Sequence, residues 1–172
     1  AKSRDMTAFL LNSGACVSSE DDDGNSPLMS LIAYGGHDAV ITFLEQGRAD
    51  GGTGYDINAK SWKTGYSALT CAIRTLNEKS VEIIQRLLSK GADPNLSDLK
   101  NNTCLHEATY LFITLCRGFA VDATSMKEDT VVCLQIVKML IQAGADITRV
   151  NEEGNIPFLL LCHSDCFHNA PE

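Results

Sequence analysis

The run from Cys162 to His168 contains the densest group of side chains able to bind a metal. Cys162, His163, Cys166 and His168 fall within seven residues. Thiolate and imidazole are the ligands of structural zinc, but such sites ordinarily take two ligand pairs separated by a loop. Here all four candidates lie in one short run, so we expect no bound metal. A second ligand pair from chain beyond residue 172 is the alternative that the sequence leaves open.

The glycine-rich run Gly51-Gly52-Thr53-Gly54 raises the question of a phosphate-binding loop. Such a loop continues with Lys and Ser or Thr and follows a buried strand, and this run has neither feature. No cysteine has a His and an acidic residue at a spacing typical of a catalytic nucleophile. The sequence therefore predicts no catalytic residue, no cofactor and no enzymatic activity in this chain.

Composition narrows the class of partner. The 172 residues are 44% hydrophobic, which is enough for one folding unit with a sizeable core. A net charge of −8 without a basic cluster argues against direct contact with nucleic acid or an anionic membrane surface, and mildly favours a basic partner. No apolar run approaches the ~20 residues of a membrane span. Seven scattered cysteines, an odd number, indicate a reducing compartment, the cytoplasm or the nucleus.

Four segments end with an apolar helical pattern followed by glycine. In the clearest one, Ile83, Ile84, Leu87 and Leu88 share one helical face, and Gly91 suits the left-handed residue that ends a helix. A Pro-Asn pair three residues later favours a turn. The helix-ending glycines are separated by 33, 44 and 53 residues, at Gly14, Gly47, Gly91 and Gly144. A period of 33 with about 11 and about 20 inserted residues accounts for these spacings.

A second signature begins a helix in the same segments. Ser or Thr caps a helix N-terminus, and proline suits its first turn. The four slots are Ser26-Pro27-Leu28-Met29, Ser67-Ala68-Leu69-Thr70, Thr103-Cys104-Leu105-His106 and Ile156-Pro157-Phe158-Leu159. The two motifs recur in phase over nearly the whole chain, and together they resemble the ankyrin-repeat family, whose first helix begins with Thr-Pro-Leu-His. The resemblance implies a structural role for His106, in hydrogen bonds to the backbone.

The resemblance implies an all-α ankyrin-repeat solenoid in one domain, residues 1–172, with four to five helix-turn-helix repeats and hairpin fingers. Phe9, Phe43 and Phe158 fall on core positions. Insertions at 48–55 and 115–133 are expected, and the second either extends its flanking helices or forms an ordered loop. The expected divisions are a partial repeat at 1–23, repeats at 24–64 and 65–100, a repeat with the long interhelix insertion at 101–153, and a partial capping repeat at 154–172.

In this family the finger tips and inner helices form a concave binding surface. Carried over position by position, that surface receives the only Trp and three of the four Tyr residues. Exposed Trp and Tyr are common interface anchors, although Tyr34 and Tyr110 could instead shield neighbouring helices. Acidic neighbours would suit an extended peptide carrying Lys or Arg. The predicted partner-binding residues are Asp22, Asp23, Asn25, Tyr34, Trp62, Lys63, Tyr66, Arg74, Leu99, Glu107, Tyr110, Leu111 and Glu152.

The resemblance implies a non-enzymatic protein–protein interaction module, acting as an adaptor, scaffold or regulator through its concave face. One alternative is a regulatory ankyrin segment of a larger enzyme or effector whose catalytic domain lies outside this chain. Another is a scaffold that makes its contacts through the insertions. Asn95, with Leu87 eight positions earlier and Asp93 two earlier, also resembles the asparagine-hydroxylation pattern of ankyrin domains.

Overall fold

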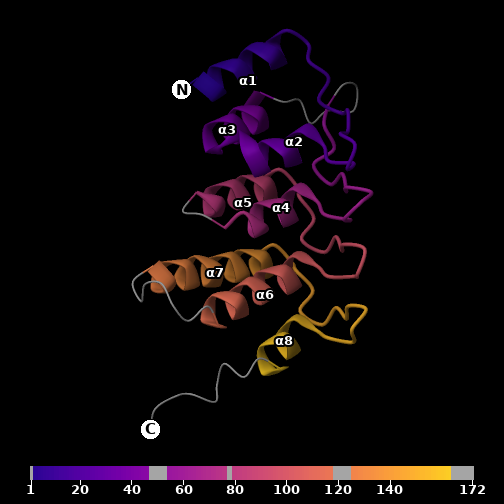
Figure 1. Ribbon diagram of the computed structural model, residues 1–172, viewed down its shortest axis with the longest axis vertical. Helices are drawn as coiled ribbons and strands as arrows, with labels where there is room; N and C mark the ends of the chain where they lie inside the picture. The colour runs from indigo at the N-terminus through magenta and orange to yellow at the C-terminus, as the bar shows by residue number, and fades with distance from the viewer. Residues whose placement is uncertain (1, 47–53, 77–78, 118–124, 164–172) are drawn as a thin grey trace.

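The computed structural model describes residues 2–46, 54–76, 79–117 and 125–163, and their helices stack in two parallel rows (Figure 1). Neighbouring helices within each row contact one another, and hairpin fingers project from the side of the inner row. The outer row contains α1 (Lys2–Asn12), α3 (His37–Gln46), α5 (Ser80–Ser89) and α7 (Ser125–Gln142). The inner row contains α2 (Pro27–Ser30) with the π-helical turn η1 (Leu31–Gly35), then α4 (Ala68–Arg74), α6 (Cys104–Arg117) and α8 (Pro157–His163). The predicted all-α solenoid is confirmed.

Local chemistry begins and ends the helices as the motifs predict. The Ser26 hydroxyl accepts the backbone N–H of Met29 at 3.4 Å, and the Ser67 hydroxyl accepts that of Thr70 at 3.3 Å. Each cap satisfies one of the N–H groups that the first helical turn leaves without a partner. Gly91 follows α5 with φ +90°, and Gly14 and Gly144 follow α1 and α7 with φ +79° and +87°. Gly47 lies outside the described residues.

The turn of each finger is held by a short side chain that accepts hydrogen bonds from backbone N–H groups. Asp98 Oδ1 accepts the N–H groups of Lys100 and Asn102, both at 2.8 Å. The residue just before Asn102 is Asn101, with φ +60°, and glycines fill the matching place in other fingers. At Gly24 a side chain would also overlap the indole of Trp62, so this position requires glycine for space as well as for conformation.

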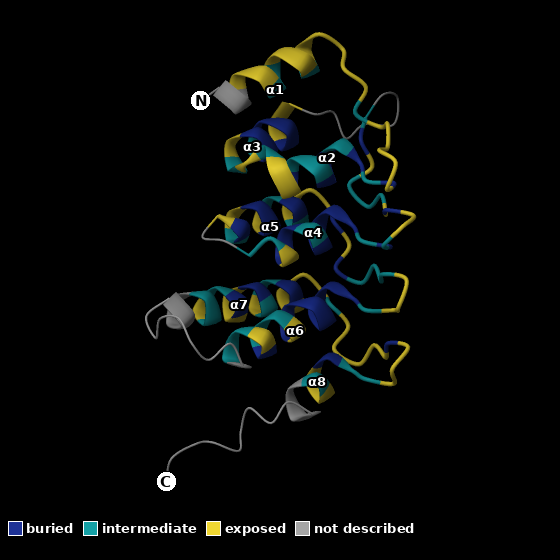
Figure 2. Ribbon diagram, in the orientation of Figure 1, coloured by how far each residue is buried: buried dark blue, intermediate teal, exposed yellow. Residues whose placement is uncertain are grey.

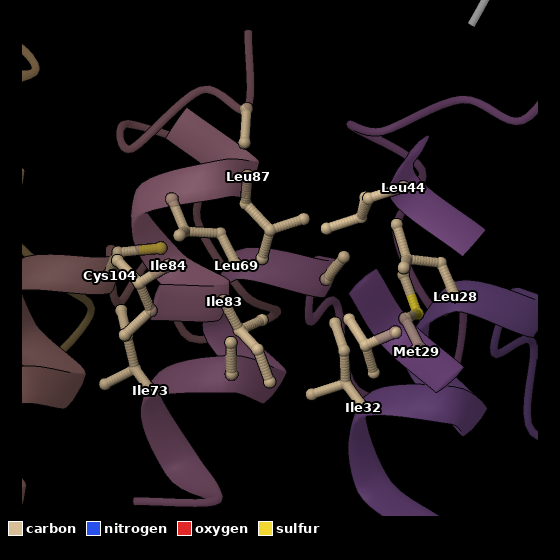
Figure 3. Packing of buried hydrophobic residues seen from close by; sticks show 14 of the residues in the cluster. Leu28, Met29, Ile32, Leu44, Leu69, Ile73, Ile83, Ile84, Leu87 and Cys104 are labelled. Carbon is tan, nitrogen blue, oxygen red and sulfur yellow. The ribbon is translucent and has the colours of Figure 1, made fainter. Parts of the chain in front are cut away.

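The core is continuous because each repeat packs its apolar residues against the next. Figure 3 shows Leu28 and Leu44 of one repeat facing Leu69 and Leu87 of the following repeat, with Cys104 reaching in from the repeat after that. No single pair of helices is thick enough to bury such side chains alone, so the stack is held together by its interfaces.

The insertion at 115–133 lengthens two helices. α6 and α7 have 14 and 18 residues, whereas α4 and α5 of the preceding repeat have 7 and 10. Of the two alternatives for this insertion, the described residues favour extension of the helices. Residues 118–124 and 47–53 lie outside the described part of the chain, and the second of these ranges includes most of the first insertion. Tyr55, the last residue of the first insertion, is buried with its ring 4.9 Å from that of Phe43.

Two of the three phenylalanines predicted to lie in the core are exposed. Phe43 is buried as predicted, but Phe9 and Phe158 are exposed, so for them the prediction is wrong. Both stand on the terminal helices α1 and α8, which in Figure 2 carry large exposed areas. A side chain at a core position of the repeat is buried only when a neighbouring helix covers it. The sequence motif does not show which repeats have such a neighbouring helix. The predicted repeat boundaries stay a prediction.

Candidate partner-binding groove

A groove of about 470 Å³ lies between the fingers and the inner helices α4, α6 and α8. Six of the residues predicted to bind a partner line it together: Lys63, Tyr66, Arg74, Leu99, Glu107 and Tyr110. We call this space the concave groove. Its residues come from three successive repeats, which the 33-residue period brings to the same side of the stack.

The centre of the concave groove is an ion pair stacked on an aromatic ring. Arg74 Nη1 donates to Glu107 Oε2 at 2.7 Å, and the guanidinium carbon lies 4.8 Å from the centroid of the Tyr66 ring. Glu107 is buried, whereas nearly half of the Arg74 side chain is exposed. Burial, and next the Glu107 carboxylate, raise the pKa of Tyr66, so its hydroxyl stays protonated and able to donate. The pair therefore presents a fixed, partly exposed cation beside an aromatic face.

The rim of the concave groove combines exposed apolar and charged side chains. Leu99, on a finger, and Tyr110, on α6, contribute exposed apolar surface to the lining. Lys63 forms an ion pair with Asp23 of the preceding finger. Lys100 and Glu153 also line the groove. A chain lying in it would thus meet both apolar and charged side chains, a combination that suits a peptide better than a small apolar ligand.

The remaining predicted residues lie outside the concave groove. Asp22 and Glu152 are exposed on fingers, Trp62 is exposed over Gly24, and the Asn25 amide donates to Asp21 Oδ2 at 3.0 Å within its own finger. Leu111 is half-buried against the core.

Tyr34 lies apart from the groove as well. It lines a second, apolar groove beside α1. The structure thus brings together the residues of the middle repeats and leaves the first repeat's Tyr34 separate.

Thr64, Asp98 and Asn151 line the concave groove but were not among the predicted residues. A signal for two of them was present in the sequence. Asp98 and Asn151 each stand four positions before an asparagine, at Asn102 and Asn155, and accept its backbone N–H. This spacing marks the turn of a finger, and the turn places the first residue beside the groove.

His106 has the structural role that the motif implies. Its Nδ1 accepts the backbone N–H of Thr103 at 3.2 Å, so Nε2 carries the proton and lies 3.0 Å from the carbonyl oxygen of Asn155 in the next finger. The imidazole is buried; Nδ1 fixes the first turn of its own helix through Thr103, and Nε2 joins this repeat to the next one.

No metal-binding cluster is evident in the described residues, and two of their thiols are buried. None of their His, Cys, Asp and Glu side chains form a group of three or more suited to a metal ion. Of the zinc candidates, Cys166 and His168 lie outside the described residues, as do the side chains of Cys162 and His163. Burial raises the pKa of Cys104 to about 12 and that of Cys133 to about 11, so these thiols pack as small apolar groups.

Among the described helices, none combines the length and the apolarity that crossing a membrane requires.

Comparison with known proteins identifies relatives of the whole stack. Residues 1–98 match the family model described as "Ankyrin repeats (3 copies)". "Ankyrin repeat protein B18" of Vaccinia virus (strain Ankara) is 25% identical over 174 residues, covering 96% of this chain and 28% of the viral protein. A "Putative ankyrin repeat protein" of Rickettsia felis is 34% identical over 102 residues, covering 59% of this chain and 38% of that protein. The chain therefore spans less than half the length of these relatives.

Proposed function

Because the chain belongs to the ankyrin-repeat family, whose repeats generally mediate protein–protein interaction, we propose that it binds an extended segment of another protein along the concave groove. The observation that carries the proposal is the convergence in one groove of Arg74 from α4, Glu107 and Tyr110 from α6, and Tyr66 from the finger just before α4. Tyrosine and arginine are the residues in which interface binding energy is concentrated. We propose a non-enzymatic role as an adaptor, scaffold or regulator.

The charges favour a partner segment with basic residues at its ends. Inside the concave groove, Arg74 and Lys63 already pair with Glu107 and Asp23, so they attract an acidic partner weakly. The finger tips beyond it carry the exposed acids Asp22 and Glu152, and the whole chain has a net charge of −8. A segment with apolar residues in the groove and Lys or Arg over the fingers matches this distribution. No direct nucleic-acid or membrane binding is part of the proposal, and the cytoplasm or nucleus is the proposed location.

The first alternative is that this stack regulates a larger enzyme or effector. Because the chain spans only 28% of the viral relative's length, a longer protein would have room for a catalytic domain elsewhere. In that case the concave groove would bind a segment of the same polypeptide. Asparagine hydroxylation at Asn95 is less favoured, since its side chain donates to the carbonyl of Gly144 and accepts the N–H of Asp146.

A peptide selection tests the proposed function. A library of random peptides is selected on the chain, and the affinities of enriched peptides are measured by fluorescence anisotropy. The Tyr66→Ala, Tyr110→Ala double variant should bind them at least about tenfold more weakly, as loss of hot-spot residues does. Val131→Ala, at an exposed apolar position of α7 that lines neither groove, is the control and should leave the affinity unchanged.

The result separates the two parts of the proposal. Equal binding by the folded double variant would exclude the concave groove as the site. Peptides that need the two tyrosines but lack Lys and Arg would leave the groove as the site and overturn the proposed basic partner. Circular dichroism of each variant shows that its helices are intact.

A further inference from the structure

Only one oxygen of the Glu107 carboxylate has a side-chain donor among the described residues. Glu107 Oε2 accepts a hydrogen bond from Arg74 Nη1 at 2.7 Å, and no other described residue donates to this carboxylate. The Glu107 side chain is only 9% exposed, so few directions are open to a donor that approaches Oε1. A carboxylate oxygen that is covered without a donor costs free energy, so a partner that closes the concave groove has to supply one.

Glu107 Oε1 opens toward the concave groove. Among the described side chains, the Tyr55 hydroxyl is the one polar group that is both fully enclosed and without a hydrogen-bond partner. Oε1 has no partner among these residues either, so it is not enclosed and keeps a path to solvent. Because Glu107 lines the concave groove, that path leads into it.

Arg74 presents further donors beside this acceptor. A guanidinium has five N–H groups, and the carbon at its centre lies over the Tyr66 ring here, 4.8 Å from the ring centroid. Nη1 donates to Glu107, and no described residue accepts from Nε or Nη2. Since 45% of the Arg74 side chain is exposed, these donors stay within reach of a ligand. The pair therefore offers the partner an acceptor and a donor next to each other.

The two charges of the pair cancel, and this decides which ligand fits best. A Lys or Arg side chain that donates to Oε1 would lie beside the Arg74 guanidinium, and a carboxylate that accepts from Arg74 would lie beside Oε1. Each charged ligand would lose its solvent shell and also meet a like charge. A neutral amide has both an acceptor oxygen and N–H donors, so it can bond to both members of the pair at a lower desolvation cost.

We propose that the centre of the concave groove recognises a carboxamide side chain, Gln or Asn, of the bound segment. The amide nitrogen donates to Glu107 Oε1, and the amide oxygen accepts from the Arg74 guanidinium. Such recognition rests on the proposed function and adds one requirement to it: a neutral amide at the centre of a segment whose Lys or Arg residues lie over the finger tips. Glu107 and Arg74 then determine specificity, while Leu99 and Tyr110 provide apolar contact.

Peptides that the chain enriches from a random library are the probes. Those that lose affinity for the Tyr66→Ala, Tyr110→Ala double variant bind in the concave groove, and they should share a Gln or Asn at one position. Each is resynthesised with Gln replaced by Met, which has a similar volume without the amide, and by Glu, which has the same shape with a charge; Leu and Asp serve for Asn. Fluorescence anisotropy should show that both changes weaken binding at least about tenfold, since each leaves part of the pair without a partner.

The Glu107→Gln variant is the second arm, because it changes the charge of the pair with little change in shape. The new amide donates where the carboxylate accepted, and Arg74 keeps an unbalanced positive charge, so this variant should bind the Glu peptide at least as tightly as the Gln peptide. Glu45→Gln is the matched control, since Glu45 also pairs with an arginine, Arg86 Nη1 at 2.9 Å, but on the outer row of helices. It should keep the preference of the unaltered chain for Gln over Glu.

Two kinds of failure can be told apart. If no enriched peptide depends on the two tyrosines, the proposed function fails and amide recognition fails with it. If groove-dependent peptides share no Gln or Asn, or bind equally well after Gln→Met, the groove remains the site but recognises no side-chain amide; a backbone amide of the partner would give the second result. An unchanged preference for Gln over Glu in the Glu107→Gln variant would also overturn the proposal. If circular dichroism shows that variant unfolded, the peptide substitutions decide alone.

Discussion

Leu87, in the middle of the stack, and Leu10, at its N-terminal end, stand at the same position of the repeat, four residues before a helix-ending glycine. Leu87 is fully buried, and Leu10 is half exposed. Their local sequences form the same kind of helix, so the difference comes from the neighbouring helices alone. The comparison shows that side chains in this molecule are buried at the interfaces between repeats. A residue at a motif position contributes its full stabilisation only when the helices on both sides of it are present.

The largest expected effect tests this comparison directly. Leu87→Ala should lower the free energy of unfolding by about 2–5 kcal/mol, because it leaves a cavity in a packed core. Leu10→Ala should cost less than about 1 kcal/mol, because much of its side chain already contacts water. Urea unfolding followed by circular dichroism, at a protein concentration where the chain is monomeric, measures both. Equal losses for the two variants would show that the terminal helix is covered in solution.

The ion pair between Arg74 on α4 and Glu107 on α6 allows a second comparison, between a partly exposed and a buried partner of the same contact. Arg74→Met should destabilise the fold by about 2–3 kcal/mol, because it leaves the buried Glu107 carboxylate without its cation. Glu107→Gln should cost only about 1 kcal/mol, because the amide still accepts a hydrogen bond and the partly exposed Arg74 can be solvated. Urea unfolding of both variants gives the difference. If Glu107→Gln were the more damaging of the two, the asymmetry in burial would not control the energy of this pair.

Smaller effects are expected at the hydrogen bonds that join successive fingers. The Asn95 side chain donates to the carbonyl oxygen of Gly144 at 3.0 Å and accepts the N–H of Asp146 at 2.7 Å. Asn58 makes the same two contacts with Gly91 and Asp93, at 3.3 Å and 2.8 Å.

Either Asn→Ala substitution should cost about 1–2 kcal/mol, since it removes two hydrogen bonds at a partly exposed site. The Asn58 variant should lose at least as much, because it uncouples repeats that have neighbours on both sides. Thermal unfolding monitors both, with Asp22→Ala as a control on a finger tip.

The last prediction concerns reactivity and not stability. A hydrogen bond with the Ser18 hydroxyl, 3.6 Å from the sulfur, lowers the pKa of Cys16 at the exposed end, while burial raises that of Cys104 in the interior to about 12. Since the thiolate is the reactive form, Cys16 should react with iodoacetamide at lower pH than an ordinary thiol, and Cys104 should stay protected up to pH 9.

Peptide mapping by mass spectrometry measures the order of labelling. Addition of urea should remove the protection of Cys104. Similar rates for the two thiols in the native chain would contradict the division into a covered interior and open ends.

Local chemistry made a large part of the fold predictable. Ser26 and Ser67 cap helices, and Gly91 ends one, through groups within a few residues of themselves. The resemblance to ankyrin repeats then implied that Tyr66, Arg74, Glu107 and Tyr110 share one surface, and all four line the concave groove. A position in the repeat indicates which face a residue occupies but not which residue it touches. The contact of Arg74 with Glu107 and the packing of Trp62 over Gly24 depend on how one repeat is rotated against the next, and no local pattern encodes that rotation.

By itself, the sequence determined the family and the positions of most helix ends, because caps, glycine turns and apolar periodicity act over distances of a few residues. The face on which the groove residues lie followed from the resemblance to that family. Only the tertiary structure decided which equivalent positions are buried, and it separated Phe43 from Phe9 and Leu69 from Phe158. Burial requires a second surface, and whether that surface is present is a property of the whole stack. It also decided that the concave groove has at its centre an ion pair between the buried Glu107 and the partly exposed Arg74.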